Sequence, residues 1–154
     1  MKIIKLELIR PFIDAGERVL NDMLSIHAKA GQIILKERPY PLYEVSAMLG
    51  IHGDVEGVIV LSMSKEASAK VVIGLLGNEI SDGERLTADA VGEVLNIIVG
   101  AGKGQLEGNI GCGIPSVIIG TGHTVWQPRD IPSALIKFET DWGDMALEVN
   151  FKTD

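Results

Sequence analysis

Residues 84–108 read ERLTADAVGEVLNIIVGAGKGQLEG, and this stretch decides the fold. When it is projected as a helix at roughly 100° per residue, its apolar side chains spread over most of the circumference. A helix that is apolar nearly all round belongs in the core of a domain. The stretch therefore predicts one long central helix. Its apolar positions are Ala90, Val91, Val94, Leu95, Ile97, Ile98, Val99, Ala101 and Leu106.

The polar residues of this helix are confined to one narrow stripe. Asp89, Glu93, Asn96, Gly100 and Lys103 all fall within a sector of roughly 80° on the same projection. Glu93 and Asn96 are spaced i and i+3, so they point the same way. An ordinary solvated face would carry long charged side chains, whereas this stripe holds a short amide, a carboxylate and a glycine. We expect a functional site here, and the alternative is an edge that merely touches water.

Three glycines occur near the end of the predicted helix, where glycine is unfavourable, so their presence needs an explanation. Gly100, Gly102 and Gly104 would each cost a helix interior about 1 kcal/mol relative to alanine. The helix could stop near Gly100, or another backbone could pack closely against it. Alternatively, the stripe stays flat so that a partner protein can approach Glu93 and Asn96. The sequence leaves these three explanations open.

The segments on either side of the long helix indicate a mixed α+β domain. Helical spacing marks one amphipathic helix before it, with Pro11 in or just outside the first turn. Ser64 and Gly77 are suited to begin and end a second helix, and Ser81 or Thr87 could cap the long one. The class that follows is an antiparallel sheet covered by helices. The expected elements are a helix at 8–24, a possible short strand at 32–35, a hairpin of strands 43–52 and 56–63, a helix at 64–76, a strand at 116–120, and a hairpin of 134–140 with 145–152.

Composition narrows the possible functions. We expect residues 1–154 to form a single domain, since the chain shows no shift in composition. No run approaches the roughly 18 apolar residues of a membrane span, and the first ten residues do not resemble a secretory leader, so we expect a cytoplasmic protein. The net charge of −7 disfavours nucleic acid and anionic membranes as partners.

Several common chemical motifs are missing from the chain. The glycine string around Lys103 does not match a phosphate-binding loop, because Ile97 and Gly104 occupy the places of its first glycine and its Ser or Thr. His27, His52 and His123 are scattered without a zinc-binding spacing. Cys112 is the only cysteine, which excludes an internal disulfide and a thiolate cluster. We therefore predict no metal site.

The stripe carries a resemblance to a known family. Residues 89–100, DAVGEVLNIIVG, resemble the phosphatase helix of the CheC/CheX/FliY family, in which an Asp or Ser precedes E-x-x-N and a glycine often follows. The other expected elements occur in matching order from about residue 10 to residue 150. We find one E-x-x-N, because Glu17 and Asn21 are spaced i and i+4. A single motif is similar to the CheX branch, whose members are typically homodimers.

The resemblance implies a phosphatase. Proteins of this family dephosphorylate the phospho-aspartate of a CheY-like receiver domain and so terminate a chemotaxis or related two-component signal. Asn96 would orient the attacking water, and Glu93 would pair with the active-site lysine of the receiver. Asp89, Gly100 and Lys103 flank these two and would contact the partner. The resemblance also implies that Mg²⁺ comes from the receiver and that this chain binds no cofactor of its own.

Two other functions remain open at this point. A non-catalytic adaptor or scaffold of the same fold would dock receivers without hydrolysing them. A small-molecule sensor would use a pocket near Cys112 and Trp126. Retention of both Glu93 and Asn96 at helical spacing favours the enzyme.

Overall fold

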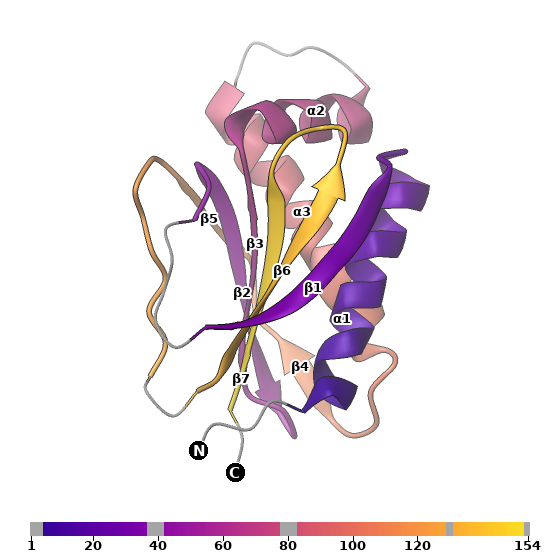
Figure 1. Cartoon of the computed structure of the whole chain (residues 1–154), viewed down its shortest axis with the longest axis vertical. Coiled ribbons are helices and arrows are strands. Elements are labelled where there is room, and N and C mark those ends of the chain that lie inside the picture. The colour runs from indigo at the N-terminus through magenta and orange to yellow at the C-terminus, as the bar shows by residue number, and fades with distance from the viewer. Residues whose placement is uncertain (1–4, 37–41, 78–82, 129–130, 153–154) are drawn as a thin grey trace.

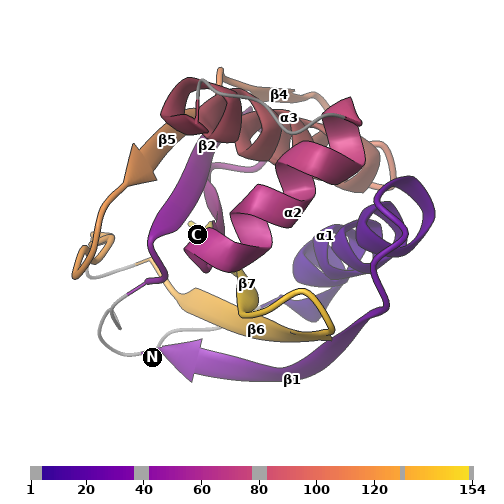
Figure 2. The same cartoon turned by 90° about the horizontal axis from the view of Figure 1, so that it is seen from above.

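A curved antiparallel sheet wraps around three helices (Figures 1 and 2). The computed structural model describes residues 5–36, 42–77, 83–128 and 131–152. This arrangement confirms the predicted α+β class. The elements are α1 (Leu6–Arg18), the π-helical turn η1 (Val19–Met23), β1 (Ala28–Lys36), β2 (Val45–Gly53), β3 (Gly57–Met63), α2 (Lys65–Leu76), α3 (Gly83–Lys103), β4 (Ile110–Cys112), β5 (Ser116–Ile119), β6 (Ser133–Thr140) and β7 (Met145–Phe151).

The sheet has the strand order β1-β6-β7-β3-β2-β4, and β5 also pairs with β2. The C-terminal hairpin β6–β7 therefore lies between β1 and β3. Side chains alternate between the two faces of each strand, and on β2 the core residues Val45, Ala47 and Leu49 face the helices. Ser46, between them, faces the outside of the sheet. Its hydroxyl lies 2.8 Å from His123 Nε2, so the segment after β5 crosses this outer face.

Helices α1 and α3 lie side by side against the sheet, and α2 crosses one end of α3 (Figure 2). Phe12 of α1 is fully buried and its ring meets that of Phe151 on β7 edge-on, with centroids 5.4 Å apart. These contacts leave α3 with one side toward α1 and the sheet and another side toward solvent. The long helix is thus central, as predicted.

The residues predicted to begin and end α2 are confirmed. Ser64 Oγ accepts a hydrogen bond from Ala67 N at 3.1 Å, which satisfies a donor at the helix start. Gly77 ends the helix in the left-handed region, with φ of 74°. The two predicted hairpins, β2–β3 and β6–β7, are also confirmed in antiparallel register.

Several predicted boundaries are wrong. Pro11 lies inside α1, beyond its first turn. The predicted short strand lies in the second half of β1, which runs over nine residues and contains a register shift between Ala30 and Ile33. The long helix ends at Lys103 rather than Gly108, and β4 was not predicted. Thr87 does not cap α3, because its hydroxyl donates to Gly83 O within the helix, and Ser81 lies outside the described residues.

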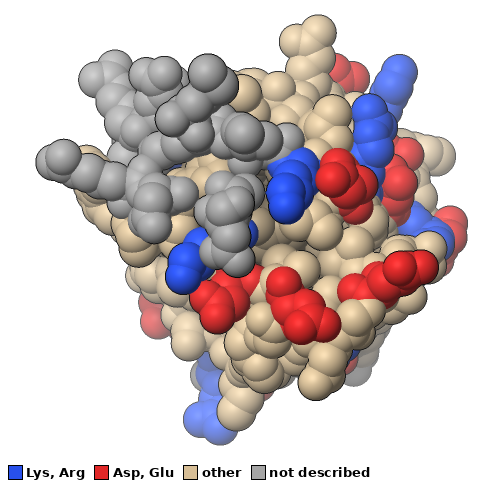
Figure 3. Space-filling view, turned by 90° about the horizontal axis from the view of Figure 1, so that it is seen from below, with Lys and Arg blue, Asp and Glu red and all other residues tan. Residues whose placement is uncertain are grey.

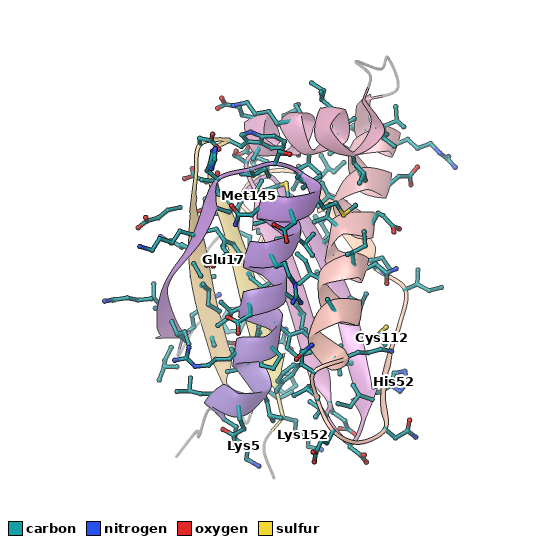
Figure 4. All side chains as sticks on the ribbon, turned by 90° about the vertical axis from the view of Figure 1, so that its right-hand side faces the viewer. Lys5, Glu17, His52, Cys112, Met145 and Lys152 are labelled. Carbon is teal, nitrogen blue, oxygen red and sulfur yellow. The ribbon has the colours of Figure 1, made fainter. Side chains whose placement is uncertain are left out.

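Glu17 and Asn21, which miss the E-x-x-N spacing, hold the turn from α1 into β1. Glu17 Oε2 accepts from Ala30 N at 2.8 Å, and Asn21 Nδ2 donates to Glu17 O and Ala28 O at 2.7 Å each. Glu17 is visible on α1 in Figure 4. These two polar side chains are therefore committed to the backbone of their own chain.

Candidate functional site

The candidate site is the solvent side of α3. Six apolar side chains of α3 face inward and are buried together with two glycines, so packing holds the helix in place rather than propensity alone. Asp89, Glu93, Asn96 and Gly100 are exposed along the other side, and Lys103 is half-buried. The structure therefore places all five predicted site residues on one stripe. The buried residues are Ala90, Val91, Gly92, Val94, Leu95, Ile98, Val99 and Gly102.

Glu93 and Asn96 are adjacent on this stripe and have no partner inside the chain. They are three residues apart on a regular helix, so their side chains leave the same face. Among the residues that the structure describes, neither side chain hydrogen-bonds or ion-pairs with another group of the protein. A carboxylate and an amide are therefore presented to whatever approaches α3, and the helix fixes their spacing.

The glycines of α3 serve different purposes. The helix continues through Gly100 and Gly102 and ends at Lys103, so the explanation that it stops near Gly100 accounts for Gly104 alone. A Cβ on Gly102 would overlap the ring of Phe12, whose Cε1 would be 2.8 Å away, so this glycine permits close packing against α1. A Cβ on Gly100 would meet no atom within 4 Å. Gly100 thus lies open on the stripe, as a flat approach surface would require.

Residues 113–117, which lead from β4 into β5, form a wall beside the stripe. A Cβ on Gly92 would sit 3.5 Å from Val117 Cγ2 and 3.7 Å from Pro115 Cγ, so this segment packs directly on α3. Figure 4 shows Cys112 close to α3 on the same side. Ile114, next to Pro115, is 90% exposed. Sequence reasoning missed this wall, because only the folded chain brings residues 113–117 to Gly92.

The described residues do not gather three or more His, Cys, Asp or Glu side chains that could hold a metal ion. His27 and His52 are exposed, and His123 lies against Ser46 on the outer face of the sheet. Within the described ranges, no helix has the length and apolar character that crossing a membrane requires. Acidic and basic side chains mingle on the face seen in Figure 3, where no continuous basic patch is visible.

Two hollows lie on the outer face of the sheet, away from α3. They have volumes of about 340 and 620 Å³ and share Ile34, Tyr43 and Lys137 in their walls. Burial, followed by the negative charge of Asp144, raises the pKa of Tyr43 above 10.0. Cys112 and Trp126 do not line either hollow. These hollows therefore give no support to a sensor pocket at those two residues.

Comparison with known proteins identifies the family. The family model described as "Chemotaxis phosphatase CheX" matches residues 45–139, from the start of β2 to the second-last residue of β6. This range includes the whole of α3 with Glu93 and Asn96. The chain belongs to the CheX family. The predicted resemblance to this branch is confirmed.

Individual CheX relatives extend the match. A protein of Thermotoga maritima named CheY-P phosphatase CheX is 30% identical over 104 residues, which make up 65% of each of the two chains. The crystal structure of a CheX from Desulfovibrio desulfuricans is 34% identical, with a TM-score of 0.87 over 95% of this chain and 99% of that one. A CheX of Borrelia burgdorferi, solved in a complex with CheY, BeF3 and Mg²⁺, is 25% identical, with a TM-score of 0.83 over 97% and 100% of the two chains.

Proposed function

We propose that this CheX-family chain hydrolyses the phospho-aspartate of a CheY-like receiver domain and so terminates a chemotaxis or related two-component signal. The observation that carries the proposal is the adjacent, exposed and unpartnered pair Glu93 and Asn96 on α3. The name of the Thermotoga relative and the CheY bound to the Borrelia relative support the choice of substrate.

In this proposal Asn96 positions the water. Phosphoryl transfer to water needs positioning and charge stabilisation more than covalent help. An amide offers one donor and one acceptor group, so it can hold a water in line with the phosphorus. Because Asn96 stands on a helix packed against the core, its reach toward the partner is restricted and little order has to be gained on binding.

Glu93 serves docking rather than attack on phosphorus. A carboxylate would be repelled by an anionic phosphoryl group unless a cation lay between them. Pairing with the active-site lysine of the receiver uses the same charge favourably and fixes the register that brings Asn96 to the acyl phosphate. The receiver also contacts Asp89, Gly100 and Lys103, which lie along the same stripe. The Mg²⁺ of the reaction is held by the acidic residues of the receiver in this scheme.

The test is the decay of a phosphorylated CheY-type receiver from the same organism, with wild-type protein, Asn96→Ala or Glu93→Ala added. We expect Asn96→Ala to lower the accelerated rate about 100-fold or more, the usual effect of removing one positioned polar group, while receiver binding is kept. Glu93→Ala should weaken binding. Both side chains are exposed, so neither change should disturb the fold.

Glu139→Ala is the matched control, because it removes an exposed carboxylate from β6, on the part of the sheet farther from α3. It should leave the decay rate and the binding unchanged. Full activity of Asn96→Ala would contradict its role. Binding of the receiver by wild type without faster decay would make the protein an adaptor instead.

We also propose that the chain forms a homodimer through β1. This strand is at one end of the described strand order, and it exposes 63% of Leu35 and 40% of Ile34. A long edge strand with exposed apolar side chains readily pairs with another strand. Sedimentation should give twice the chain mass of 16.5 kDa, and Leu35→Lys should shift the protein toward monomer. A wild-type monomer at micromolar concentration would contradict the dimer.

A further inference from the structure

Ile114 is the most exposed large hydrophobic residue in the described part of the chain, at 90%. Single exposed apolar side chains are common on protein surfaces and need no explanation by themselves. Ile114 differs from these because it lies near the stripe and because its backbone is held in place.

Ile114 belongs to the segment that packs on α3 next to the stripe. Its neighbour Pro115 packs on Gly92, and Asn96 follows Gly92 by four residues, which places it one helical turn further along the same side of α3. The segment that carries Ile114 therefore flanks the stripe on the side of Asn96. A protein surface brought down onto Glu93 and Asn96 would also pass over Ile114.

The backbone on both sides of Ile114 is held in place. Gly113 N donates to Gly50 O at 3.0 Å, and Ser116 begins β5 opposite Met48 of β2. With Pro115 seated against α3, the exposure of Ile114 results from a supported backbone and not from a loose loop. A preordered apolar side chain costs little conformational entropy when a partner covers it.

We infer that Ile114 is a docking residue, which packs against an apolar patch of the receiver beside its phospho-aspartate pocket and thereby determines how tightly the receiver is held. The inference rests on the proposed phosphatase function. It commits to the receiver as the occupant because this surface is continuous with the stripe that carries Glu93 and Asn96.

The experiment uses Ile114→Ser in two assays: the decay of the phosphorylated receiver, and the binding of the receiver loaded with BeF3. We expect the receiver concentration for half-maximal decay, and the Kd, to rise about tenfold, as the loss of one buried aliphatic contact predicts. The maximal decay rate should stay within about twofold, since the residue acts on binding and not on the water.

Trp126→Ser is the matched control. Trp126 is 74% exposed, but it follows His123 in the segment that crosses the outer face of the sheet. Its removal should change neither assay. Equal receiver affinity in Ile114→Ser and wild type would overturn the inference.

The two proposals fail in distinguishable ways. If wild type binds the receiver without speeding its decay, the phosphatase function fails, and the Kd of Ile114→Ser still decides the docking role. If wild type neither binds nor dephosphorylates the receiver, both proposals are overturned. If wild type is active and Ile114→Ser matches it, only the docking role is wrong.

Discussion

Two regions of this molecule differ in the burial and the partners of their polar side chains. On the outer face of the sheet, Lys36 Nζ lies 2.9 Å from Glu148 Oε1, and both side chains are only 2% exposed. On the stripe of α3, Glu93 and Asn96 are exposed and have no partner among the described residues. The first region pairs its two buried charges with each other, whereas the second presents its polar groups to the solvent.

The difference shows how to separate a structural polar residue from a functional one. A buried charge without an opposite charge costs several kcal/mol, so Lys36 and Glu148 are tied to each other by the requirements of the fold. An exposed carboxylate or amide stays hydrated, so it costs the fold no desolvation free energy when it has no protein partner. Residue type alone would have grouped Glu148 with Glu93, and burial separates them.

Glu148→Ala should have the largest effect on stability. The change removes the carboxylate and leaves the buried Lys36 ammonium without it, so we expect the free energy of unfolding to fall by about 3–5 kcal/mol. Urea unfolding measures this. Glu93→Ala, the matched change on the stripe, should alter the same quantity by less than about 0.5 kcal/mol.

A second variant distinguishes the lost pair from lost packing. Replacing both partners, as in Lys36→Met with Glu148→Leu, should recover most of the stability, because an apolar pair fills the same space without a buried charge. If Glu148→Ala and Glu93→Ala lowered the free energy of unfolding by similar amounts, the proposed difference between the two regions would be wrong.

The buried and exposed sides of α3 differ in the same way, and one glycine on each side tests this difference. Gly102→Ala should lower the free energy of unfolding by about 1–3 kcal/mol, since Phe12 is fully buried and cannot easily move away from the added Cβ. Gly100→Ala meets no neighbouring atom and should raise stability by up to about 1 kcal/mol, the difference in helix propensity. Urea unfolding of both variants decides this.

Gly100→Ala carries a second readout. If a flat stripe matters for the partner, the more stable variant should nevertheless bind the BeF3-loaded receiver more weakly. Unchanged receiver binding would show that the open space over Gly100 has no role in docking. Equal loss of stability in both glycine variants would contradict the inward and outward assignments.

The parts of the fold that follow from short-range physics could be predicted from the sequence. The hydroxyl of Ser64 and the conformational freedom of Gly77 act within one helical turn, so they mark α2 without knowledge of the rest. The polar stripe also follows from periodicity alone, because Asp89, Glu93 and Asn96 project from one helix.

Features that depend on distant segments could not be predicted. β4 is only three residues long, lies among glycines, and exists because Ile110 and Cys112 pair with β2. The length of β1 depends on its pairing with β6, more than 90 residues away. Ile114 looks ordinary in the sequence, and its segment flanks the stripe only because Pro115 packs near Gly92 in the folded chain.

The strand order has a consequence for how the chain is made. Among the described strands, β6 and β7 come last in sequence, yet they occupy the middle of the sheet and separate β1 from β3. While the ribosome is still synthesising residues before Ser133, β1 has no neighbour in the sheet and β3 pairs only with β2. The two halves of the sheet join when the C-terminal hairpin enters between them, so completion of the fold coincides with completion of the hairpin.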